Sequence, residues 1–199
     1  MNTIDQYLEL LQEIKCRTHV ITSLDISGNY PFHNVNVELA CLQIRRILEL
    51  IAFASLTSNV ELYSKEYEKF AKFWNAERML RDMETVHPLF YPMPVYQSPT
   101  EYGTELVALD EELFLTKKDF VKVYKKCGAV MHSDNPYGSK VDYGYYKENI
   151  VLWMNKIRNL LNAHKIKLVG SEDLYLIQMG SMKEKPSCNI FKVISPPTA

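Results

Sequence analysis

Two short segments of the sequence place a cation six residues before a histidine, and these two residue types together suit chemistry on a phosphate. Arg158 precedes His164 in one segment, and Lys126 precedes His132 in the other. A guanidinium can stabilise the charge on a phosphate in transfer, and an imidazole can move a proton to or from a ribose oxygen. Arg158, His164 and His132 are therefore candidate catalytic residues, and Lys126 and Asn159 are candidate binding residues.

The segment from Arg158 to His164, RNLLNAH, resembles the motif of the HEPN family. Members of this family are small helical-bundle domains with a ribonuclease site made by an arginine and a histidine four to six residues apart. An asparagine often follows the arginine directly, as Asn159 does here. The resemblance covers these seven residues and the helical layout of the chain. It implies that Arg158 holds the scissile phosphate and that His164 moves the proton.

The same resemblance implies a metal-independent endoribonuclease or RNA-targeting effector of a bacterial toxin or phage-defence system. Such an effector would act on RNA in the cytoplasm without a cofactor. A symmetric homodimer would bring two arginine and histidine sets into one groove. The chain contains no phosphate-cradling glycine-rich loop, His-Glu-x-x-His zinc helix or nucleophile-elbow pattern, so the enzyme classes that depend on them are not expected.

His132 gives a second match to the motif, because HEPN-like domains place their catalytic histidine at a helix C-terminus before a tight turn. Lys126 then stands where the family has arginine, and lysine offers a point charge in place of a planar fork. With that departure the domain becomes a noncatalytic helical module that binds a protein partner, as an antitoxin or regulator would. For either histidine a structural role is the alternative, with the ring capping the last carbonyls of a helix.

A central helix is predicted over Asn34 to Ser58, where an asparagine can cap the start and the interior holds neither glycine nor proline. Apolar residues occupy nearly all of its sides, which is typical of a helix packed by neighbours on several faces. Arg45 and Glu49 lie one turn apart and can pair, while Arg46 points about 100° away. These three residues form either a narrow solvated stripe or a cationic group that faces an anion or an active-site groove.

Four further helices are predicted from apolar residues at steps of three and four. They cover Ile4 to Cys16, Glu61 to Thr85, Thr116 to about Met131, and Tyr145 to His164. Long connections are expected over Arg17 to His33 and over the proline-rich segment from His87 to Gly103. Two apolar runs within about residues 167–195 predict a β-hairpin. The predicted fold is mainly α, one domain over residues 1–199 with a four- or five-helix bundle and a C-terminal β-hairpin.

Composition limits the classes of function. The 199 residues carry a formal net charge of -1, whereas nucleic-acid-binding domains usually have a clear overall positive charge. A local basic patch is still compatible with this net charge. The four cysteines lie far apart without a Cys-x-x-Cys pair, so we expect reduced thiols and no zinc site. The N-terminus lacks signal-peptide features, and four polar residues interrupt the longest apolar stretch, Ala40 to Leu56. A soluble protein without a membrane segment is expected.

Overall fold

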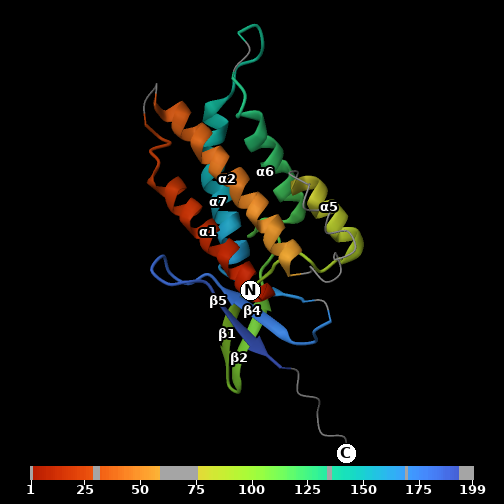
Figure 1. Cartoon of the computed structure of the whole chain (residues 1–199). Helices are drawn as coiled ribbons and strands as arrows, with labels where there is room; N and C mark the ends of the chain where they lie inside the picture. The colour runs from red at the N-terminus through yellow and green to blue at the C-terminus, as the bar shows by residue number, and fades with distance from the viewer. Residues whose placement is uncertain (1, 29–31, 59–75, 134–135, 169, 193–199) are drawn as a thin grey trace, which may run out of the picture.

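Helix α2 (Phe32–Thr57) lies at the centre of the helical half of the molecule, as the sequence predicts (Figure 1). The computed structural model describes residues 2–28, 32–58, 76–133, 136–168 and 170–192. In this described part, α2 packs against four other helices. They are α1 (Thr3–Ser23), α5 (Ala76–Val86), α6 (Lys117–Ala129) and α7 (Tyr143–Leu161). Because α2 buries residues on most of its sides, it forms the middle of the hydrophobic core.

A five-stranded antiparallel sheet lies below the helices, so the prediction of a helical bundle with a single hairpin was wrong (Figure 1). The strand order is β2-β1-β3-β4-β5. The strands are β1 (Met93–Thr100), β2 (Gly103–Ala108), β3 (Ala163–Ile166), β4 (Leu174–Gln178) and β5 (Ser187–Phe191). The predicted C-terminal hairpin is present as β4 and β5, but the other three strands extend it. The chain is therefore an α/β protein.

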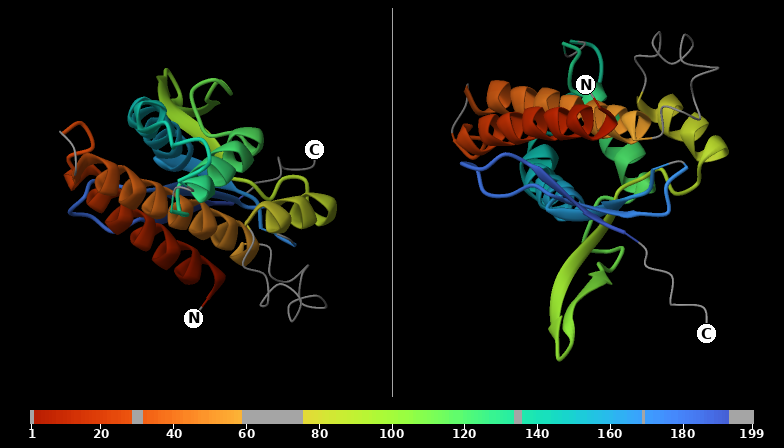
Figure 2. Two further views of the ribbon diagram at one scale, coloured as in Figure 1. Left: turned by 90° about the horizontal axis from the view of Figure 1, so that it is seen from above. Right: turned by 60° about the horizontal axis from the view of Figure 1, so that its bottom comes forward.

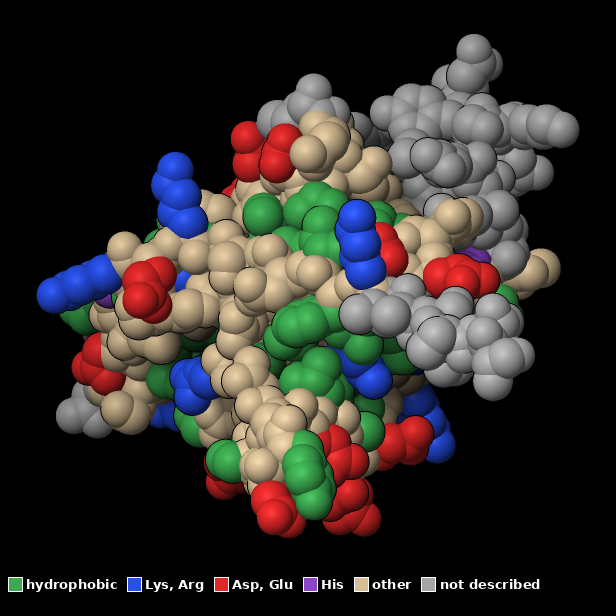
Figure 3. Space-filling view, turned by 90° about the horizontal axis from the view of Figure 1, so that it is seen from below, with side chains coloured by type: hydrophobic (Ala, Val, Ile, Leu, Met, Phe, Trp, Pro, Cys, Tyr) green, Lys and Arg blue, Asp and Glu red, His purple; other side chains and the backbone are tan. Residues whose placement is uncertain are grey.

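The β1–β2 hairpin projects away from the rest of the molecule (Figure 2). Strand β1 pairs with β3 only through Met93 and Pro94, so its outer part pairs with β2 alone. Tyr102 at the tip is 94% exposed, and acidic side chains gather around this protrusion (Figure 3). The prediction of a long connection over His87 to Gly103 was wrong. Proline lacks a backbone N–H, and β1 tolerates it because most of this strand has one open edge.

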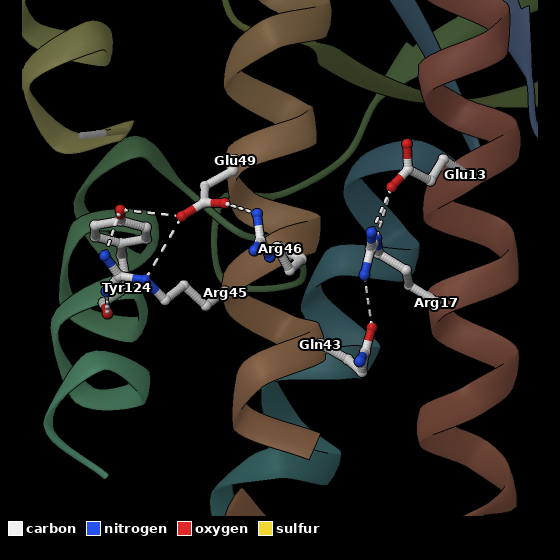
Figure 4. A network of polar contacts seen from close by, with 7 residues as sticks. All are labelled: Glu13, Arg17, Gln43, Arg45, Arg46, Glu49 and Tyr124. Atoms are coloured by element: carbon white, nitrogen blue, oxygen red, sulfur yellow. Dashed lines mark hydrogen bonds and ion pairs between the residues drawn. The ribbon is translucent and has the colours of Figure 1, made fainter. Parts of the chain in front are cut away.

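Helix α1 continues to Ser23, well past the predicted end at Cys16, so the expected connection from Arg17 was wrong at its start. The added turns pack against α2. Ile21 is buried, and Arg17 Nη1 donates to Gln43 Oε1 of α2 at 2.8 Å (Figure 4). Local propensity is a weak signal that such tertiary contacts override.

Helix α7 ends at Leu161, so the prediction that it runs to His164 was also wrong. His164 lies in β3, opposite Ile177 of β4 on one side and Pro94 of β1 on the other. A buried residue in a strand that follows a helix can match the helical spacing of apolar residues by chance. Periodicity alone does not tell such a strand residue from a further turn of the helix. In contrast, α6 starts after Thr116 as predicted, and the Thr116 hydroxyl accepts the Asp119 backbone N–H at 3.1 Å.

The predicted helix from Glu61 to Thr85 is described only in its second part. Residues 59–75 lie outside the described residues, and the remainder belongs to α5. In the ranges that the structure describes, no helix combines the length and the apolar character needed to cross a membrane.

Candidate functional site

His164 is completely buried, with 0% of its surface exposed, and both ring nitrogens have partners. Nδ1 lies 3.0 Å from the Leu161 carbonyl oxygen, which can only accept, so Nδ1 carries the proton and donates it. Nε2 then accepts the hydroxyl of Tyr7 at 2.7 Å. Burial lowers the pKa of His164 to about 4, although the hydrogen bond to Leu161 opposes the shift. A neutral ring locked in this way is suited to holding α1 against the sheet.

Arg158 and His164 are not brought together in an open groove. Arg158 lies on the exposed side of α7, and its Nη1 donates to Asn155 Oδ1 at 3.3 Å. The next residue, Asn159, donates from Nδ2 to the Leu113 carbonyl at 2.8 Å and so ties α7 to the β2–α6 connection. Of this predicted trio, Arg158 is among the residues that line a pocket between α1 and α7.

His132 and Lys126 are both exposed at the C-terminal end of α6. The helix ends at Ala129, so His132 lies just beyond it and not within its last turn. The Lys126 ammonium lies 4.9 Å from the centroid of the Tyr145 ring on α7, which places the cation over an aromatic face. These two residues keep the accessibility that a proton-transferring or phosphate-holding group requires.

A groove of about 550 Å³ runs between α6 and α7 beside Lys126. Lys122, Lys125, Lys126 and Lys156 contribute the basic side chains of this α6–α7 groove, and Asp119 is its one acidic residue in the described part. The remaining lining is apolar or aromatic, from Leu115, Val123, Ala129, Tyr145, Leu152 and Trp153. The groove therefore combines an excess of positive charge with an apolar floor.

Two of the groove lysines already have acidic partners. Lys156 Nζ lies 2.9 Å from Asp119 Oδ2, and Lys125 Nζ lies 2.8 Å from Glu77 Oε1 on α5. Burial would raise the pKa of Asp119, but the hydrogen bond and charge of Lys156 outweigh it and lower that pKa. Lys122 and Lys126 are exposed and are the more available cations for a bound anion.

A network of polar contacts joins α2 to α6 (Figure 4). It consists of Arg45, Arg46 and Glu49 of α2 and Tyr124 of α6. The predicted pair is present, with Arg45 Nε 3.5 Å from Glu49 Oε1, and Arg46 Nη1 lies 3.5 Å from Glu49 Oε2. Arg45 Nη2 also donates to the Tyr124 hydroxyl at 2.7 Å, and its guanidinium carbon lies 3.9 Å from the centre of the Tyr124 ring. These contacts use the charge of Arg45 internally, which favours a structural role over anion binding.

Gly128 makes room for this network at the end of α6. A Cβ atom at this position would lie 2.6 Å from Arg45 Nη1, closer than two such atoms can approach. Glycine has a low helix propensity, and the close approach of an arginine from α2 compensates for this cost.

Lys15 is a buried cation that the sequence did not single out. Only 4% of its surface is exposed, and its ammonium donates to the carbonyls of Met179, Ser181 and Glu184 at 2.5, 2.8 and 2.7 Å. Burial lowers the pKa of Lys15, and the charge of Glu184 opposes the shift. The sequence did contain one signal that Lys15 is buried: it follows Leu11 by four residues, so both side chains lie on the same face of α1.

The chain matches no known family model, curated protein or solved structure. The likeness to HEPN domains thus stays a prediction from the motif. Among the described residues, no group of three or more His, Cys, Asp or Glu side chains could hold a metal ion.

Proposed function

We propose that the protein targets RNA as a binding module, with a single strand held along the α6–α7 groove. The observation that carries the proposal is the composition of this groove: four lysines and one aspartate around an aromatic and aliphatic floor. Proteins that bind single-stranded nucleic acid without sequence preference combine these two features, since lysines follow the phosphates and aromatic rings stack on bases. The overall charge of -1 does not oppose this function, because the basic groups are local.

Binding is favoured over cleavage because of the state of the histidines. His164 is buried and neutral, so it cannot exchange a proton with a strand in the groove. Cleavage remains a second candidate through His132, which is exposed beyond the end of the helix that carries Lys126. The cytoplasmic location and the homodimer belong to the same proposal and rest on the sequence resemblance.

The test is the fluorescence anisotropy of labelled single-stranded RNA of about 12 nucleotides, a length within the usual range of single-strand sites. Exchanging Lys122 and Lys126 together for alanine should weaken RNA binding about tenfold near 0.1 M salt, because two phosphate contacts are lost. The slope of the logarithm of the binding constant against the logarithm of the salt concentration should become shallower by about 1.4. Tyr145→Leu should weaken binding by a similar factor through lost stacking. Lys183→Ala, at an exposed lysine outside the groove, is the matched control.

Several outcomes would contradict this proposal. Binding of RNA that is unchanged in the Lys122 and Lys126 variant would place any RNA site elsewhere. Poly-glutamate that binds as tightly as RNA would show a site for an acidic protein partner. RNA cleavage in EDTA that disappears in His132→Ala would replace the binding module with a ribonuclease, and His164→Gln would then retain activity.

A further inference from the structure

A second pocket lies on the other side of α7, between α1, the end of α7 and the segment that follows β4. Its volume is about 200 Å³. The described lining consists of Ile14, Lys15, Thr18, Met154, Ile157, Arg158, Leu161, Asn162, Met179, Gly180 and Met182. None of these residues lines the α6–α7 groove, so this α1–α7 pocket is a separate feature that does not depend on the proposed function.

The charge of the α1–α7 pocket is positive, because Arg158 and Lys15 line it and no acidic residue of the described lining balances them. The carboxylate of Glu184 lies outside this lining; it accepts the Ser181 backbone N–H at 2.7 Å, and its charge acts on Lys15. The ammonium of Lys15 uses its three hydrogen-bond donors on carbonyl oxygens, so it offers no hydrogen bond to a ligand.

Arg158 is the group that remains available to a ligand. The only hydrogen bond that its side chain makes to a described residue runs from Nη1 to Asn155 Oδ1, which leaves most of the guanidinium fork open. The exposed side-chain amide of Asn162, one turn further along the chain, lines the same pocket and can donate a second hydrogen bond. A planar guanidinium fork matches a carboxylate better than a spherical anion, and an amide on the lining of the same pocket can add a hydrogen bond.

The rest of the pocket is apolar and adaptable. Met154, Met179 and Met182 line it together with aliphatic side chains, and the unbranched methionine side chain adjusts readily to irregular shapes. Met182 is 54% exposed, and as an exposed residue of the lining it can cover an apolar ligand. Contact between an exposed methionine and an apolar ligand has a favourable free energy, because it removes apolar surface from water.

We propose that the α1–α7 pocket binds a small amphipathic carboxylate, with its head on Arg158 and Asn162 and its apolar body among the three methionines. An apolar cavity of about 150 Å³ accommodates benzene, so a pocket of about 200 Å³ suits a body of roughly six to eight carbon atoms. This volume lies below the roughly 300 Å³ at which ligand pockets usually begin, which favours a small ligand over a peptide segment or a nucleotide.

The experiment follows the methionine methyl signals of the full chain by NMR during titration with octanoate. The chain has eight methionines, of which three line the pocket. We expect Met154, Met179 and Met182 to shift together with saturation, while the others stay in place. Arg158→Ala should weaken octanoate binding at least about tenfold, the size of one charged hydrogen bond. Arg81→Ala, which removes an exposed arginine of α5, should bind as the wild type does.

Met182→Glu is a second variant that should weaken octanoate binding, because its carboxylate repels the ligand from an exposed position. Equal affinity for 1-octanol and octanoate would overturn the role of Arg158, and tighter binding of octyl phosphate would overturn the choice of a carboxylate. Methyl shifts spread over all eight methionines, or no saturable shift at all, would overturn the site.

Discussion

Replacing Lys15 with methionine should lower the free energy of unfolding by about 3 kcal/mol. Methionine keeps the aliphatic part of the side chain but removes three charge-assisted hydrogen bonds, each with a net value of about 1.5 kcal/mol or more. Part of the loss is recovered, because water can reach the carbonyls of the exposed residues Ser181 and Glu184 and because methionine does not bear the burial cost of the ammonium that lowers the pKa of Lys15. Urea denaturation followed by circular dichroism measures the change.

The control for this prediction is Lys183→Met, which alters an exposed lysine in the same β4–β5 connection. Exposed substitutions of this kind change stability by about 0.5 kcal/mol or less. Hydrogen exchange adds a local measurement: the Lys15 variant should exchange faster at the amides of residues 179–184. A loss below about 1 kcal/mol with unchanged exchange would mean that Lys15 does not hold the β4–β5 connection to α1.

Acidification from pH 6.5 to pH 4 should remove about 3 kcal/mol of stability through His164 alone. The unfolded chain binds a proton at this histidine near pH 6.5, whereas the folded chain binds it only near pH 4. The unfolded state therefore holds more protons in this window, and stability falls as the pH falls. The contribution is fully present above pH 6.5 and is lost as the pH approaches 4.

The measurement is the difference in unfolding free energy between wild type and His164→Gln as a function of pH. Glutamine can still accept the Tyr7 hydroxyl but does not titrate. Between pH 6.5 and pH 4 the variant should therefore lose about 3 kcal/mol less stability than the wild type. The comparison is needed because burial, and secondarily the charge of Lys167, also lowers the pKa of His87, so this histidine adds its own pH dependence. His132→Gln makes the same exchange at an exposed histidine and controls for the substitution itself.

Parallel pH profiles for wild type and His164→Gln would show that His164 titrates as an accessible residue. The locked position in β3 would then be wrong, and the predicted catalytic role of His164 with Arg158 would regain support. NMR decides between the two cases: a His164 Cε1–H signal that stays unshifted down to about pH 4.5 supports the buried state, and a signal that shifts near pH 6.5 contradicts it.

The local pattern of the sequence was sufficient for the elements whose stability is local or nearly so. The continuous apolar character of residues 34–58 predicts a central helix, and α2 has neighbours on several sides. Thr116 and Asp119 predict the start of α6 because the capping hydrogen bond spans only three residues. The pairing of Arg45 with Glu49 follows from one helical turn, and it forms.

Tertiary structure alone decided the sheet and the surroundings of the candidate site. Pro94 and Pro99 argue against a strand locally, yet β1 forms because β2 and β3 supply its partners. His164 continues the helical spacing of α7, but Tyr7, which is 157 residues away in sequence, completes its burial. Lys15 is one charged residue on an amphipathic helix until three carbonyls far along the chain surround it.

The sequence by itself determined which residue types could do chemistry and where the main helices lie, because capping and periodicity act over a few residues. It did not determine which of those residues would meet, since that depends on contacts between distant segments. The groove between α6 and α7 collects its lysines from two helices and an aromatic floor from one of them. The fold likewise placed Arg158 beside Lys15 in a pocket and His164 in the core, because burying apolar surface outweighs the proximity of residues in the sequence.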